Sequence, residues 1–68
     1  MTFNISERAA RVADILESIE ELSKMIAFHH NESKDRSMKS QYESMRQALL
    51  NELNTLLATY DLSIQFAA

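Results

Sequence analysis

The hydrophobic residues in the first half of the chain repeat every seven positions. One position of the repeat holds Ile5, Val12, Ile19 and Ile26, and the position three residues later holds Ile15 and Leu22. Residues seven apart stay on one side of a helix when two helices pack together in a left-handed supercoil, as in a coiled coil. Arg8 and His29 interrupt the second position. The pattern predicts an amphipathic helix over about residues 5–30.

The second half of the chain carries a broader apolar stripe at helical spacing. Its central members are Met38, Tyr42, Met45, Leu49, Leu53, Leu56 and Tyr60. On a helical wheel of about 100° per residue they fall within an arc of about 80°. Leu50 and Leu57 widen the arc to roughly 140° in its C-terminal half. We predict a helix over about residues 36–60, with a stripe too wide for one neighbouring helix to cover.

A short polar segment, residues 31–36, separates the two patterns and contains no hydrophobic residue. A connection this short places two helices antiparallel and side by side. Asn31 is the candidate for the left-handed residue that ends the first helix, because the chain has no glycine. Ser33 or Asp35 is expected to cap the second helix.

The start of the first helix offers two candidate caps. Asn4 is one, with Glu7 three residues later as its capping-box partner, and Ser6 is the other. Charged residues four positions apart are expected to pair along the helices. These expected pairs are Glu7–Arg11, Glu20–Lys24 and Lys39–Glu43.

The tail, residues 61–68, changes period. Leu62, Ile64 and Phe66 alternate with more polar residues, which is the pattern of a strand. A single short strand is not stable in water. We expect an extended tail that either lies on the helices or adds to a partner's sheet edge.

These elements predict an all-α fold: a single domain over residues 1–68, an antiparallel two-helix hairpin that dimerises into a four-helix bundle. A chain of 68 residues without cysteine has few ways to stabilise a small core, and association is the simplest. The expected core is Ile5, Val12, Ile15, Leu16, Ile19, Leu22, Ile26, Met38, Tyr42, Met45, Leu49, Leu53, Leu56 and Tyr60. Leu50 and Leu57 are the expected dimer contacts.

Composition excludes several classes of function. Without glycine the chain has no phosphate-binding loop of the nucleotide-binding proteins. A net charge of −3 argues against nucleic acid or an anionic membrane as the partner. Uninterrupted apolar runs of at most four residues fit neither a membrane span nor a signal peptide, so a cytoplasmic protein is expected.

The residues that favour metal binding gather at the turn: His29, His30 and Glu32. Adjacent helical residues point about 100° apart, so both imidazoles do not easily reach one ion. His29 and Glu32 have the spacing used by helical metal sites. The alternative is that both histidines are residues of the helix end, where a positive charge suits the helix dipole.

Catalytic groups are hard to assemble in a hairpin. Glu17, Glu20 and Glu21 lie on a helix face that should be solvated. No serine has a histidine at a sequence spacing that indicates a catalytic pair. Met25 and Phe28 lie off the main stripe and would mark a contact site near the turn if exposed. We expect no enzymatic activity and no cofactor.

The functional hypothesis from the sequence is a protein–protein interaction module that works as a homodimer. Its expected contact residues are Leu50, Leu57, Tyr60, Leu62, Ile64 and Phe66. One alternative is a metal- or ligand-binding bundle that uses the turn-end histidines. The other is a weak nucleic-acid-associated regulator with Lys34, Arg36 and Lys39 as its basic end.

Overall fold

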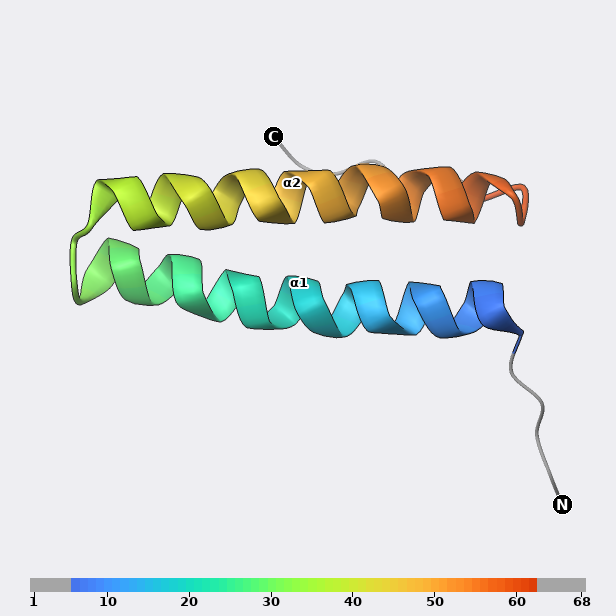
Figure 1. The fold of residues 1–68 in the computed structure, drawn as a ribbon, viewed down its shortest axis with the longest axis horizontal. Helices are drawn as coiled ribbons and strands as arrows, with labels where there is room; N and C mark the ends of the chain where they lie inside the picture. The colour runs from blue at the N-terminus through green and yellow to red at the C-terminus, as the bar shows by residue number, and fades with distance from the viewer. Residues whose placement is uncertain (1–5, 63–68) are drawn as a thin grey trace, which may run out of the picture.

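The protein is an antiparallel helical hairpin (Figure 1). The computed structural model describes residues 6–62, in which α1 spans Glu7–Asn31 and α2 spans Arg36–Ala58. The two helices lie side by side along their whole length, which confirms the predicted all-helical hairpin. Ile5, Ile64 and Phe66 lie outside the described residues. Neither helix combines the length and apolar character needed to cross a membrane.

Each helix begins at a side-chain cap. Ser6 caps α1, where its hydroxyl accepts a hydrogen bond from the Ala9 amide at 3.1 Å. Asp35 caps α2, where its carboxylate accepts from the Met38 amide at 3.0 Å. These bonds satisfy backbone N–H groups that have no partner inside the helix. Of the two candidate caps, Ser6 is therefore the one that caps α1. The other candidate, Asn4, lies outside the described residues.

The end of α1 corrects one prediction. Asn31 does not take the left-handed conformation, because it is the last residue of the helix. The Phe28 carbonyl instead accepts from two successive amides, those of Glu32 at 2.8 Å and Ser33 at 3.2 Å. Lys34 is the residue with a positive φ, at 56°, and it turns the chain into the cap of α2.

α2 ends two residues earlier than predicted, in a second left-handed turn. The Leu62 amide donates to the Leu57 carbonyl and the Asp61 amide to the Ala58 carbonyl, both at 3.0 Å. Asp61 has a φ of 59°. This pair of bonds around a left-handed residue is the Schellman motif, which satisfies the last carbonyls of a helix.

The core between the helices is small. Four hydrophobic side chains of the described residues are buried: Ile15, Leu22, Ile26 and Leu53. The half-buried members of the predicted core are Val12, Ile19, Met38, Tyr42, Leu49 and Leu56. Leu16, Met45 and Tyr60 are exposed, so their placement in the core was wrong for the hairpin itself. A single partner helix covers only the middle of each apolar stripe.

One position of the seven-residue repeat in α1 faces α2 along the full length of the hairpin. Its two middle members, Ile15 and Leu22, are buried. Its first member, Arg8, donates to the carbonyl and hydroxyl of Thr59 at 3.2 and 3.1 Å. Its last member, His29, stacks on the ring of Tyr42 with 5.5 Å between centroids. The residues that interrupt the apolar pattern are therefore the polar ends of the helix–helix contact.

Candidate interaction surfaces

The first candidate surface is one long side of the hairpin, the Leu16 flank, which comprises Leu16, Ser23, Arg46, Leu50 and Leu57. Residues seven apart share a side of a helix, which groups Leu16 with Ser23 and Leu50 with Leu57. Arg46 precedes Leu50 by one turn and donates to the Ser23 hydroxyl at 3.1 Å, which joins the two rows. The Leu16 side chain is 53% exposed, and Leu50 and Leu57 are half-buried. This flank therefore presents three leucines from both helices to solvent.

The opposite side, the Met45 flank, comprises Arg11, Ser18, Met25, Met45 and Glu52. The same seven-residue spacing groups the first three on α1 and the last two on α2. Arg11 and Glu52 form the ion pair that joins these rows. Met45 is 47% exposed and Met25 is exposed as well. Phe28 near the turn is also exposed, so the condition that the sequence set for a contact site at Met25 and Phe28, their exposure to solvent, is met.

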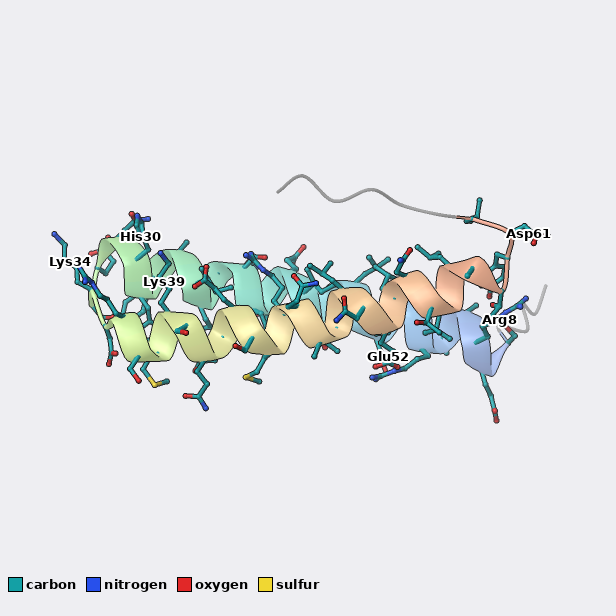
Figure 2. The ribbon with its side chains drawn as sticks, turned by 90° about the horizontal axis from the view of Figure 1, so that it is seen from above. Arg8, His30, Lys34, Lys39, Glu52 and Asp61 are labelled. Carbon is teal, nitrogen blue, oxygen red and sulfur yellow. The ribbon has the colours of Figure 1, made fainter. Side chains whose placement is uncertain are left out.

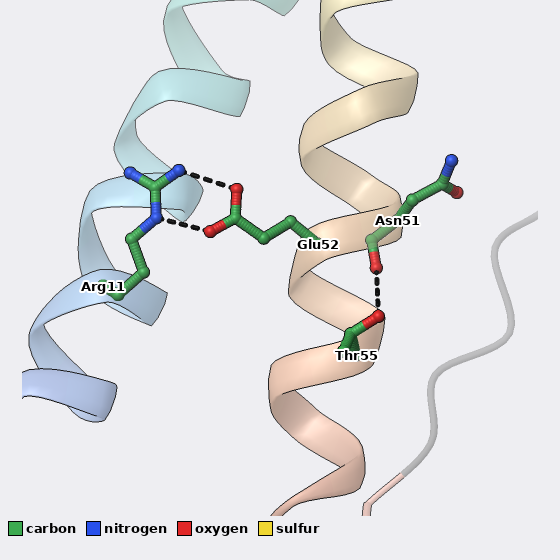
Figure 3. A network of polar contacts seen from close by, with 4 residues as sticks. All are labelled: Arg11, Asn51, Glu52 and Thr55. Atoms are coloured by element: carbon green, nitrogen blue, oxygen red, sulfur yellow. Dashed lines mark hydrogen bonds and ion pairs between the residues drawn. The ribbon is translucent and has the colours of Figure 1, made fainter.

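The Arg11–Glu52 pair is a two-bond contact between the helices (Figure 3). The guanidinium donates from Nε to Oε2 at 2.6 Å and from Nη2 to Oε1 at 2.7 Å. This hydrogen bonding lowers the pKa of the Glu52 carboxyl below its ordinary value and raises the pKa of Arg11. On the far side of α2 the Thr55 hydroxyl donates to the Asn51 carbonyl at 3.1 Å, a contact within the helix. The i, i+4 spacing predicted that Arg11 pairs with Glu7. Arg11 instead pairs with Glu52 across the hairpin.

A shallow groove runs along the Met45 flank. It is lined by Asp14, Glu17, Ser18, Glu21, Leu22, Met45 and Leu49. Leucine and methionine side chains form its apolar part, and carboxylates of α1 form one rim. Glu21 and Glu20 both hold the Lys24 ammonium, at 3.4 and 3.5 Å, so the predicted Glu20–Lys24 pair is present.

The open end of the hairpin is held by Arg8, Thr59 and Tyr60. The guanidinium carbon of Arg8 lies 3.6 Å from the centroid of the Tyr60 ring, a cation–π contact. Figure 2 shows Arg8 and Asp61 together at this end. Leu62 is 56% exposed beside them. Of the residues expected to form a contact site in the tail, Tyr60 and Leu62 are therefore exposed at one end of the hairpin.

The turn end brings the two histidines into different surroundings. His29 is half-buried between the helices, and its Nδ1 shares a hydrogen bond with the Ser33 hydroxyl at 2.6 Å. The same ring meets the Phe28 ring edge to face, with 5.1 Å between centroids. Ser33 did not become the cap of α2, and its hydroxyl instead accepts from the Asp35 amide at 3.3 Å. His29 is thus held by the turn and by aromatic neighbours.

His30 faces another residue, Lys39 at the start of α2 (Figure 2). The Lys39 ammonium lies 3.1 Å from the His30 Nδ1 and not beside Glu43, its predicted partner. Residues 6–62 hold no group of three or more His, Cys, Asp or Glu side chains placed to share a metal ion. The contacts that the structure gives His29, His30 and Glu32 are those of the turn itself.

Leu16 is an exposed residue of the Leu16 flank that the sequence pattern placed in the core. It follows Ile15 directly, and both belong to apolar repeats, so the pattern alone assigned both to the core. Adjacent residues on a helix point about 100° apart, and only one of them faces the partner helix. The exposed neighbour then belongs to the flank, in line with Leu50 and Leu57.

Comparisons of the chain with protein-family models, curated proteins and solved structures give no significant match. The functional argument therefore rests on the surfaces described above.

Proposed function

We propose that this chain is a non-enzymatic protein–protein interaction module whose working form is a homodimer, closed through the Leu16 flank into a four-helix bundle. One observation carries the proposal. The half-exposed Leu16 shares the Leu16 flank with Leu50 and Leu57, and residues 6–62 bury only four hydrophobic side chains.

Packing energetics support association. Fully burying a leucine side chain contributes roughly 1.5–3 kcal/mol. Fixing the backbone of each residue costs roughly 1–2 kcal/mol in chain entropy, so a hairpin with so few buried side chains has little surplus stability. A second copy that covers three leucines on each chain would add to that surplus in the simplest way. A symmetric dimer also uses one flank of each copy against itself.

The two flanks offer a matched pair of variants. Leu16→Glu introduces a charge on the Leu16 flank, and Met45→Glu introduces the same charge at a similarly exposed position on the Met45 flank. Sedimentation equilibrium gives the mass of each variant, and circular dichroism gives its helix content. We expect the wild type and Met45→Glu to be dimers, and Leu16→Glu to be a monomer or an unfolded chain.

Loss of helix content in Leu16→Glu, but not in Met45→Glu, supports the proposal. A position that is half-exposed in the monomer tolerates glutamate unless a partner covers it. A wild-type chain that stays monomeric at high micromolar concentration contradicts the proposal. So does a Leu16→Glu variant that keeps both the helix content and the mass of a dimer.

A further inference from the structure

The turn end of the hairpin contains a hollow with basic walls. Its lining residues are His29, His30, Asn31, Lys34, Arg36, Lys39 and Glu43. They come from the last turn of α1, the connection and the first two turns of α2, so closure of the hairpin brings them together (Figure 2). His30, Lys34 and Lys39 are seen together at this end, far from Arg8 and Asp61.

The positive charge here is concentrated in a chain that is acidic as a whole. The net charge is −3, yet three of its seven Lys and Arg residues, Lys34, Arg36 and Lys39, fall within one short segment. The ion pairs of residues 6–62 involve Arg11 and Lys24 and none of these three. The turn end therefore carries three cationic side chains that form no ion pair within residues 6–62.

The contact between Lys39 and His30 adds a directed donor. An ammonium group has only N–H donors, so the His30 Nδ1 that lies 3.1 Å from it acts as the acceptor. In the neutral imidazole the proton then resides on Nε2, which is a hydrogen-bond donor. The same contact restrains the Lys39 side chain, which is half-buried. Two of the lining groups are thus oriented before any ligand arrives.

We propose that this turn-end hollow binds a multiply charged phosphate-type oxyanion. Lys34, Arg36 and Lys39 supply charge-assisted donors, and the His30 imidazole and the Asn31 amide supply neutral ones. A phosphate group has several oxygens that accept such bonds at once, and guanidinium–phosphate contacts are among the stronger polar contacts in proteins. Glu43 is the carboxylate among the lining residues and opposes an anion. All lining residues belong to one copy of the chain.

The test uses inorganic tripolyphosphate as the probe and isothermal titration calorimetry at low ionic strength on the full chain. We expect saturable binding of one tripolyphosphate per chain. Arg36→Ala and Lys39→Ala should each weaken it roughly tenfold, which corresponds to the loss of one charge-assisted hydrogen bond. Lys24→Ala is the matched control, because its ammonium already lies between Glu20 and Glu21. It should leave the affinity within about twofold.

Glu43→Gln is expected to raise the affinity for tripolyphosphate, and a folding defect would not produce such an increase. Removing the opposing carboxylate should tighten tripolyphosphate binding by a few fold, because a like charge near the ligand is lost. Absence of saturable heat in the wild type overturns the proposal. An equal loss of affinity in Lys24→Ala and Lys39→Ala overturns it as well, since binding would then follow overall charge.

A short oligothymidylate distinguishes the two sources of phosphate. If the natural ligand is a free phosphate compound, the oligonucleotide binds no more tightly than tripolyphosphate. If it binds more tightly, and Arg36→Ala and Lys39→Ala weaken it in the same order, the phosphates belong to a nucleic acid. Oligonucleotide binding that ignores both substitutions assigns nucleic acid to another surface and counts against the turn-end site.

Discussion

The Arg11 guanidinium meets the Glu52 carboxylate through two hydrogen bonds, of 2.6 and 2.7 Å, across 41 positions of sequence. Within residues 6–62 it is the ion pair that joins α1 to α2. Its paired geometry fixes both the distance and the orientation of the two side chains. It therefore ties the Met45 flank together, while the Leu16 flank is joined by the weaker contact between Arg46 and Ser23.

This pair predicts a pH dependence of stability. The hydrogen bonds from Arg11 lower the pKa of Glu52 in the folded chain below its ordinary value of 4.5. A carboxyl with a lowered folded-state pKa stabilises the fold fully above its unfolded pKa, and this contribution is lost as the pH falls through the folded value. The wild type should be more stable than Glu52→Gln at neutral pH, and the two should converge once the pH is below that window. Thermal unfolding followed by circular dichroism from pH 7 to pH 2.5 measures the convergence.

Glu17→Gln serves as the control for this series, because Glu17 forms no ion pair within residues 6–62. It should lose little stability at neutral pH. A Glu52→Gln variant that matches the wild type throughout the pH range would show that the pair contributes nothing measurable.

The left-handed conformation of Lys34 predicts a stabilising substitution. Residues with a side chain are disfavoured at a positive φ by roughly 1 kcal/mol, whereas glycine adopts it freely. Lys34→Gly should therefore raise the free energy of unfolding by about 0.5–1 kcal/mol. Lys34→Ala keeps the unfavourable Cβ and should not. Urea unfolding of the two variants at one protein concentration tests this, and equal stability would place the turn in another conformation.

A comparison of two alanine variants tests which flank is covered. Leu16→Ala should cost about 2 kcal/mol or more if a partner buries the side chain, because it then leaves a cavity. Met45→Ala on the opposite flank should cost less than about 1 kcal/mol, as expected for a side chain that stays half in water. Denaturant unfolding at several protein concentrations gives both values, and a cost ordered the other way would move the interface to the Met45 flank.

The contact of Arg8 with Tyr60 predicts a difference between two substitutions at the open end. Tyr60→Phe keeps an aromatic ring below the guanidinium and should leave stability nearly unchanged. Tyr60→Leu removes the ring and should cost about 0.5–1 kcal/mol. Melting curves in low salt distinguish them. Equal effects of both substitutions would mean that the ring contributes only apolar area.

Much of the hairpin follows from local patterns. The polar segment 31–36 and the repeats on either side place both helices to within two residues of their ends. The caps at Ser6 and Asp35 follow from residue type. The left-handed residue was misplaced at Asn31 because hydrogen bonds to the Phe28 carbonyl close α1 one residue later, which residue preferences do not reveal.

The surfaces were harder to predict than the helices. The wide stripe on α2 predicts that Leu50 and Leu57 lie toward its edge, because the width of an arc is a property of one helix. Leu16 was assigned to the core because its exposure depends on where α2 lies against α1. The basic end with Lys34, Arg36 and Lys39 was predicted from the sequence. The contact of Lys39 with His30 was not, because these two side chains meet only when the chain reverses direction.

The polar ends of the contact between α1 and α2 also guard against misalignment. Sliding α1 by one seven-residue repeat in one direction would bring Arg8 to the buried place of Ile15, and sliding it the other way would bring His29 to the place of Leu22. Enclosing an unpaired guanidinium among apolar side chains costs several kcal/mol. Apolar repeats alone would accept either shift, because they look the same after seven residues. Arg8 and His29 make the two ends of the repeat differ from its middle, and so the two helices pack in one register.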